Sequence, residues 1–191
     1  MHKGRLEAFS DAVIAIVMTV MVLELRAPST FEWGALREQL PEFGTYAVSF
    51  TFLAIYWNNH HHMLQVAKHV NGAVLWANQH LLFWLSMIPF ATAWMGKSGF
   101  ERDPVILYGV ILTLSGVAYY LLAQTLLRAN RSDPEFAGRL GSDFKGKISV
   151  VIYVASIGLA FVSPGLSCAL YVAVALMWLI PDKRFEPIVE H

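Results

Sequence analysis

Six apolar stretches, each close to the length of a membrane-spanning helix, are the feature that most restricts how this 191-residue chain can fold. A helix needs roughly 17 to 25 apolar residues to cross about 30 Å of hydrocarbon. Hydrophobic residues make up 56% of the chain and the mean hydropathy is +0.49, more than one soluble domain of this length could bury. We therefore predict an all-α integral membrane protein, with a single membrane domain over residues 1–191. The predicted helices cover 6–26, 43–66, 72–95, 104–127, 147–163 and 166–180.

The first stretch could also be a cleaved signal peptide, because basic residues precede it. Two observations argue against that interpretation. Glu7 and Asp11 interrupt the expected basic and apolar regions, and the small residue Ala27 is followed by Pro28, which does not suit a cleavage site. We expect residues 1–26 to remain in the mature protein.

The distribution of Lys and Arg predicts how the helices are oriented. With the N-terminus inside, the cytoplasmic segments hold ten basic residues and the outer segments hold four, namely Arg26, Arg37, Lys97 and Arg102. Because cytoplasmic loops are enriched in Lys and Arg, we predict that both termini are cytoplasmic and that the chain is a multi-pass protein of a bacterial plasma or inner membrane. The formal net charge of zero gives no reason to expect nucleic acid as a partner, and the single Cys168 excludes an internal disulfide.

Prolines predict where the helices bend, begin and end. Pro89 lies inside the third stretch and should kink it, because it lacks a backbone N–H. Asp103 and Pro104 are expected to be the cap and first residue of the fourth helix. A tight turn over 163–165 is expected between the last two helices.

Asp11 is a charged residue inside the first apolar stretch, where an ionised side chain costs at least about 2.5 kcal/mol. On one helix face, contacts join residues three or four apart. Arg5 is six residues away and Glu7 would repel Asp11, so its partner should lie on another helix.

Polar residues of three predicted helices fall at one depth in the cytoplasmic third of the membrane. The second helix contributes residues 58–62, the third begins near Gly72 and contributes residues 78–80, and Asp11 lies in the same layer. We expect Arg5, Asp11, His60 and nearby asparagines such as Asn59 and Asn78 to form an interhelical network that holds the first helix in place. Polar packing without function and a proton relay are the other interpretations.

The three consecutive histidines, His60, His61 and His62, do not form a metal site by themselves. Adjacent helical residues point about 100° apart, so the three cannot all face one ion, and we predict no metal. A haem between His80 and one of the three remains a separate hypothesis, because histidines on neighbouring helices commonly ligate haem.

The first helix also carries an apolar stripe. Ile16, Val20 and Leu23 lie within an arc of about 60° at 3.6 residues per turn, with Ala12 below them. For a single chain, the simplest interpretation of this stripe is a packing surface.

A motif at the head of the first helix changes that interpretation. Arg5, Phe9, Ser10 and Asp11 are followed by the run 12–16 and by Thr19, and the second helix carries Trp57, Asn59 and His60. In these residues, and in size and layout, the chain resembles the transmembrane protein 175 family of potassium channels. The last three predicted helices match the family in their number and order, but they carry none of its motif residues.

The resemblance implies a cation channel in which the first helix of each subunit lines the pore. It implies that Ile16 forms the narrowest ring, that Val20 and Leu23 form the next rings, and that six-helix bacterial members assemble as homotetramers. Thr19 matches a pore hydroxyl of some members. From the residues alone, the Thr19 hydroxyl could equally bond back to the Ala15 carbonyl.

Two residues depart from the family's pattern, and the role of a third residue, Glu24, has two interpretations. Ala12 stands where many members have glycine, and Val20 where leucine is common, so the second ring is expected to be wider here. Glu24, near the outer mouth, could concentrate cations, or it could pair with Arg26 or with solvent.

We therefore predict a passive channel that is modestly selective for K⁺ over Na⁺, that needs no cofactor and is not an enzyme. K⁺, other monovalent cations, the lipid bilayer and further copies of the chain are its expected partners. The resemblance implies that a hydrophobic constriction provides the selectivity, and no Thr-Val-Gly-Tyr-Gly filter occurs in the sequence. The alternative is a proton-coupled transporter of ions or small solutes that uses Asp11 and the histidine layer, although no repeat or broken-helix pair supports it.

Overall fold

The structure, a computed structural model, describes residues 3–28, 30–133 and 144–179, and every regular element in these ranges is a helix. The first helix, α1, ends in a 3₁₀ turn, η1, over Met21–Glu24. The α-helices are α1 (Lys3–Val20), α2 (Trp33–Glu38), α3 (Leu40–Val66), α4 (Gly72–Ser86), α5 (Ile88–Lys97), α6 (Arg102–Ala129), α8 (Phe144–Leu159) and α9 (Pro164–Leu179).

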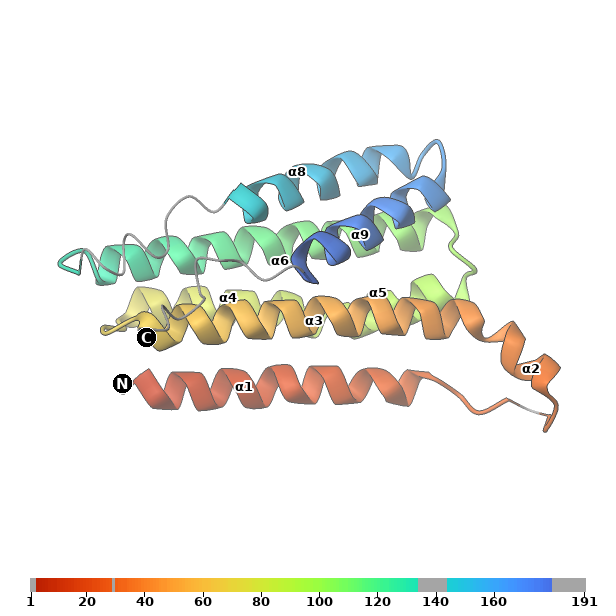
Figure 1. The fold of residues 1–191 in the computed structure, drawn as a ribbon, viewed down its shortest axis with the longest axis horizontal. Coiled ribbons are helices and arrows are strands. Elements are labelled where there is room, and N and C mark those ends of the chain that lie inside the picture. Colours follow the sequence, from red (N-terminus) through yellow and green to blue (C-terminus); the bar gives the residue numbers. More distant parts are fainter. Residues whose placement is uncertain (1–2, 29, 134–143, 180–191) are drawn as a thin grey trace, which may run out of the picture.

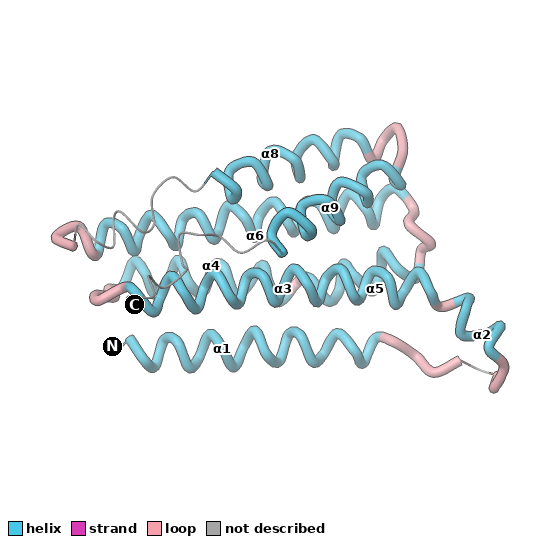
Figure 2. Tube along the Cα trace, in the orientation of Figure 1, coloured by secondary structure: helices cyan, strands magenta, loops and turns pink. Residues whose placement is uncertain are grey.

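The long helices lie side by side along the length of the molecule (Figure 1). Helix α1 forms one edge of the bundle and α8 the opposite edge, with α3, α4, α5 and α6 between them. Helix α1 packs against α3, α4 and α5, and short loops join most of the helices (Figure 2). One side of α1 therefore faces the bundle, whereas the other side faces away from it.

The third apolar stretch is divided between α4 and α5, as Pro89 predicts. Helix α4 ends at Ser86 and α5 begins at Ile88, which places Pro89 in the first turn of α5. A proline is tolerated there because the first N–H groups of a helix have no intrahelical partner. The predicted kink is confirmed.

The expected start of the fourth helix is wrong by two residues. Helix α6 begins at Arg102 with Glu101 as its cap, and Asp103 accepts a hydrogen bond from Arg102 Nε at 2.8 Å instead of capping the helix. Pro104 falls in the first turn, where its missing N–H costs nothing, so the helix can begin two residues before it.

The other helix ends differ from the expected ones by a few residues. Helix α1 begins at Lys3 and its 3₁₀ turn ends at Glu24, and α9 begins at Pro164, so the preceding turn is complete by Ser163. Position 180, the expected end of the last helix, lies outside the described residues, as do Arg139, Lys183 and Arg184 of the basic count.

By length and composition, two helical segments of the described chain could cross a membrane. They are Lys3–Glu24 and Arg102–Ala129, and Pro164–Leu179 is a shorter apolar helix.

Hydroxyl groups join three helices inside the bundle. Thr92 of α5 contacts Ser49 Oγ of α3 at 2.7 Å, and Ser49 lies 2.8 Å from the hydroxyl of Tyr108 on α6. All three side chains are buried. Nearby, Gly109 lets α6 approach α9, because a Cβ atom there would collide with the Tyr171 hydroxyl.

Candidate ion pathway on the first helix

Helix α1 has one buried face and one exposed face. The buried face consists of Leu6, Ser10, Ile14, Val17 and, in η1, Met21. On the other side, Ile16 is 60% exposed, Val20 42% and Leu23 75%. These three residues, predicted to line a pore, thus lie together on the surface of the single chain and are largely exposed.

The Thr19 hydroxyl bonds to its own helix. Its Oγ1 atom lies 3.0 Å from the carbonyl oxygens of both Ala15 and Ile16, so its single hydrogen is shared between them. Of the two sequence interpretations, the structure has the back-bonded one. Because its hydrogen is used within α1, Thr19 can offer only its methyl group and the oxygen lone pairs, as an acceptor, to the outside of α1.

A groove runs between the exposed stripe of α1 and helices α4 and α5. The α1 side and η1 contribute Ile16, Val17, Val20 and Glu24; the opposite wall consists of Ser86, Pro89, Phe90, Ala93, Trp94 and Lys97. At one end of this groove, Lys97 Nζ lies 2.9 Å from Glu24 Oε2. Glu24 therefore pairs with Lys97, and not with Arg26 as one interpretation expected.

Ser10, Asn78 and His60 form a buried chain of hydrogen bonds that joins α1, α4 and α3. Ser10 Oγ donates to the Leu6 carbonyl at 2.8 Å, so it can only accept from Asn78 Nδ2, 2.9 Å away. That contact fixes the orientation of the Asn78 amide, and its Oδ1 must accept from His60 Nε2 at 2.7 Å.

The same chain defines the tautomer of His60. The imidazole carries its proton on Nε2, and the buried Nδ1 has no hydrogen-bond partner among the described residues. The side chains of Ser10, Asn78 and His60 are fully buried. An unpaired buried acceptor is a cost, but the three linked helices gain a fixed separation and rotation.

Asp11 has its partner on another helix. Trp57 Nε1 of α3 donates to Asp11 Oδ1 at 2.9 Å, on the exposed side of the contact between α1 and α3. The donor is a neutral indole rather than a basic side chain. The arrangement satisfies one carboxylate oxygen and ties the head of α1 to α3.

The remaining residues of the predicted network take separate positions. Asn59 Nδ2 donates to the Ile55 carbonyl of its own helix at 2.8 Å. Phe9 is 46% exposed, and Arg5 is exposed and joins neither Asp11 nor His60. The structure thus replaces one network with two contacts, Asp11 with Trp57 and the buried chain through Asn78.

The consecutive histidines point in different directions. His61 stacks on Trp57 at a ring distance of 5.8 Å, whereas His60 faces Asn78, and His80 Nε2 accepts from Trp84 Nε1 at 2.9 Å. Within the described ranges, no three His, Cys, Asp or Glu side chains gather as metal ligands.

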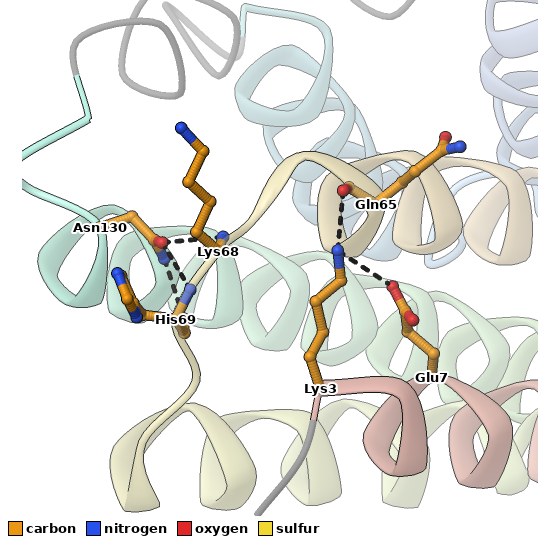
Figure 3. A network of polar contacts seen from close by, with 6 residues as sticks. All are labelled: Lys3, Glu7, Gln65, Lys68, His69 and Asn130. Atoms are coloured by element: carbon orange, nitrogen blue, oxygen red, sulfur yellow. Dashed lines mark hydrogen bonds and ion pairs between the residues drawn. The ribbon is translucent and has the colours of Figure 1, made fainter.

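Sequence reasoning missed two clamps at the end of the bundle where α1 begins (Figure 3). Lys3 Nζ donates to the Gln65 carbonyl at 2.8 Å and lies 3.6 Å from Glu7 Oε1, which attaches the start of α1 to the end of α3. A lysine near a helix C-terminus is a recognised partner of the last carbonyls, but nothing in the sequence shows which helix lies beside it.

The second clamp is Asn130, the residue after α6. Its Oδ1 accepts from the N–H groups of Lys68 and His69 at 3.0 and 2.8 Å, and its Nδ2 donates to the carbonyls of His69 and Leu126. Asn130 is only 2% exposed. One side chain thus fastens the connection between α3 and α4 to the end of α6 (Figure 3).

Comparison with known proteins places this arrangement in a family. A family model described as endosomal/lysosomal potassium channel TMEM175 matches residues 5–89, which contain both polar contacts and the apolar stripe. A protein of Chryseobacterium sp. (strain P1-3) named as a potassium channel is 49% identical over 97% of both chains. A potassium channel of Streptomyces collinus is 28% identical and covers 93% of this chain and 91% of its own.

A solved structure shares the fold. The crystal structure of a lysosomal potassium-selective channel TMEM175 homolog from Chamaesiphon minutus superimposes with a TM-score of 0.80 at 23% identity, over 93% of this chain and 96% of that one. The helical fold and the near full-length relative together define what the chain is. It is an all-helical membrane protein that belongs to the TMEM175 family of potassium channels.

Proposed function

We propose that the chain is a passive cation channel, modestly selective for K⁺ over Na⁺, in which the first helices of four copies enclose the ion pathway. The observation that carries this proposal is the exposed stripe of Ile16, Val20 and Leu23 on α1, opposite a face that is fully packed. One lining helix per subunit can enclose a path only when several copies meet around a rotation axis. The relatives' names as potassium channels support K⁺ as the permeant ion.

A ring of Ile16 side chains would act as gate and filter. Isoleucine offers no ligand that could replace the water around an ion, so passage depends on the width of the ring, its wetting and the cost of dehydration. K⁺ holds its water less tightly than Na⁺ and passes more easily. The preference is modest because no carbonyl groups compensate for the lost hydration, and no cofactor takes part.

The polar contacts would hold the lining helix at a fixed rotation. The chain through Ser10, Asn78 and His60 and the contact of Trp57 with Asp11 both lie on or beside the packed side of α1. If α1 turned by one residue, about 100°, both contacts would break and the stripe would leave the axis. Six membrane spans with cytoplasmic termini in a bacterial plasma membrane complete the proposed arrangement.

Reconstitution in liposomes tests the proposal directly. We expect wild-type protein to carry K⁺ faster than Na⁺ without a pH gradient, and Ile16→Asn to raise both fluxes and reduce the discrimination, because an amide wets the constriction. Val154→Asn is the matched control: Val154 is 55% exposed on α8, at the opposite edge of the bundle (Figure 1), and should leave the fluxes unchanged.

Three results would overturn the proposal. Unchanged flux in a well-folded Ile16→Asn oligomer would show that Ile16 does not form the constriction. Equal effects of Ile16→Asn and Val154→Asn would show that the ion pathway does not lie along α1. Flux that saturates and requires a proton gradient would instead favour the transporter mechanism. The mass of the purified oligomer tests the number of copies.

A further inference from the structure

An ion pair lies at one end of the groove beside the exposed stripe. Glu24 is the last residue of η1 and Lys97 the last residue of α5, and their charged atoms lie 2.9 Å apart. The side chains remain about half exposed, with 48% of Glu24 and 42% of Lys97 accessible. Such an exposed pair contributes little to stability, so its position is more informative than its strength.

The pair lies where the proposed pathway would open. Glu24 directly follows Leu23, the last residue of the stripe, and the groove below it contains Ile16 and Val20. Lys97 therefore draws the carboxylate toward α5 and cancels its charge. Arg26, two residues further on, is exposed and contacts neither partner among the described residues. Its positive charge is therefore the same in every variant compared below.

We propose that Lys97 sets the electrostatic potential at the outer mouth of the pathway by neutralising Glu24, and so limits the rate at which monovalent cations enter. This inference rests on the proposed channel function. In a tetramer, four neutral pairs would surround the mouth in the wild type. Removing Lys97 would leave four carboxylates there, and their attraction for cations reaches about 10 Å at 0.1 M salt and farther at lower salt.

Conductance in planar bilayers at two salt concentrations tests the inference. In about 20 mM KCl we expect Lys97→Gln to raise the K⁺ conductance about two- to threefold and Glu24→Gln, which leaves Lys97 unpaired, to lower it. The double variant is neutral at both positions and should conduct like the wild type. In about 1 M KCl the difference between Lys97→Gln and wild type should disappear, because salt screens the carboxylates. The exchange Glu24→Lys with Lys97→Glu keeps the pair neutral and should conduct like the wild type.

Arg37→Gln is the matched control, because Arg37 is an exposed basic residue on α2, which extends away from α1 beyond the end of α3 (Figure 1). An unchanged conductance in Lys97→Gln at low salt would overturn the inference, as would an increase that persists in about 1 M KCl, which would indicate a changed pore shape rather than a changed potential. An equal increase in Arg37→Gln would show that any outer charge has the same effect. Wild-type protein without current would overturn the channel function itself, and the inference with it.

Discussion

The side-chain amide of Asn78 lies 2.7 Å from the buried Nε2 of His60 and 2.9 Å from Ser10 Oγ, so one residue of α4 joins α3 to α1. None of the three side chains is exposed. In the apolar interior of a membrane protein these groups have no water to replace a lost partner. The contact therefore has a measurable consequence for stability.

Asn78→Ala should destabilise the fold by about 1–2 kcal/mol, because it leaves the His60 N–H and the Ser10 oxygen without partners. Denaturant unfolding in detergent measures the loss. Asn59→Ala is the control, since among the described residues the Asn59 side chain bonds only to the Ile55 carbonyl one turn earlier, and should cost clearly less. Equal losses in the two variants would contradict the role given to Asn78.

Gly109→Ala should destabilise the contact of α6 with α9 by about 1–3 kcal/mol, because the added methyl group collides with the Tyr171 hydroxyl and lies 2.9 Å from Ile157 Cγ1. Gly158→Ala on α8 meets nothing within 4 Å and should be tolerated. Thermal unfolding of both variants in detergent provides the comparison. In a Tyr171→Phe background the cost of Gly109→Ala should fall, and an unchanged cost would exclude this collision as the cause.

Asn130→Ala should loosen the connection between α3 and α4, because four hydrogen bonds of one side chain are lost. Amide exchange over residues 67–71 should accelerate about tenfold or more, which corresponds to about 1.4 kcal/mol of lost protection. Asn130→Asp keeps the two accepted bonds and should give an intermediate rate.

The connection between α5 and α6, residues 98–101, serves as the internal control for this measurement. It has no contact with Asn130 and should exchange at the wild-type rate in both variants. Acceleration of both connections alike would indicate global destabilisation instead of a local clamp.

Hydropathy and proline positions were sufficient to predict most of the helices. Helix α3 ends at Val66 and α4 begins at Gly72, as the apolar stretches indicate, and Pro89 marks the break before α5. The start of α6 could not be predicted in this way, because a proline is tolerated anywhere in a first turn. Helix ends depend on local contacts, which hydropathy does not contain.

The candidate site was predictable as a set of residues but not as a set of contacts. The stripe of Ile16, Val20 and Leu23 follows from 3.6 residues per turn, and the motif around Asp11 follows from the family resemblance. The partners do not follow, because Trp57 and His60 lie on one helix and only its rotation decides which of them meets Asp11.

The sequence by itself determined that this chain forms apolar helices, because a backbone in lipid must satisfy its hydrogen bonds within each segment. It also determined the two faces of α1, since side-chain spacing is a property of the helix alone. Only the tertiary structure decided which face is packed, that Asn78 joins three helices, and that Glu24 pairs with a lysine 73 residues away. These contacts depend on how neighbouring helices rotate and approach, and that is set by the packing of the whole bundle.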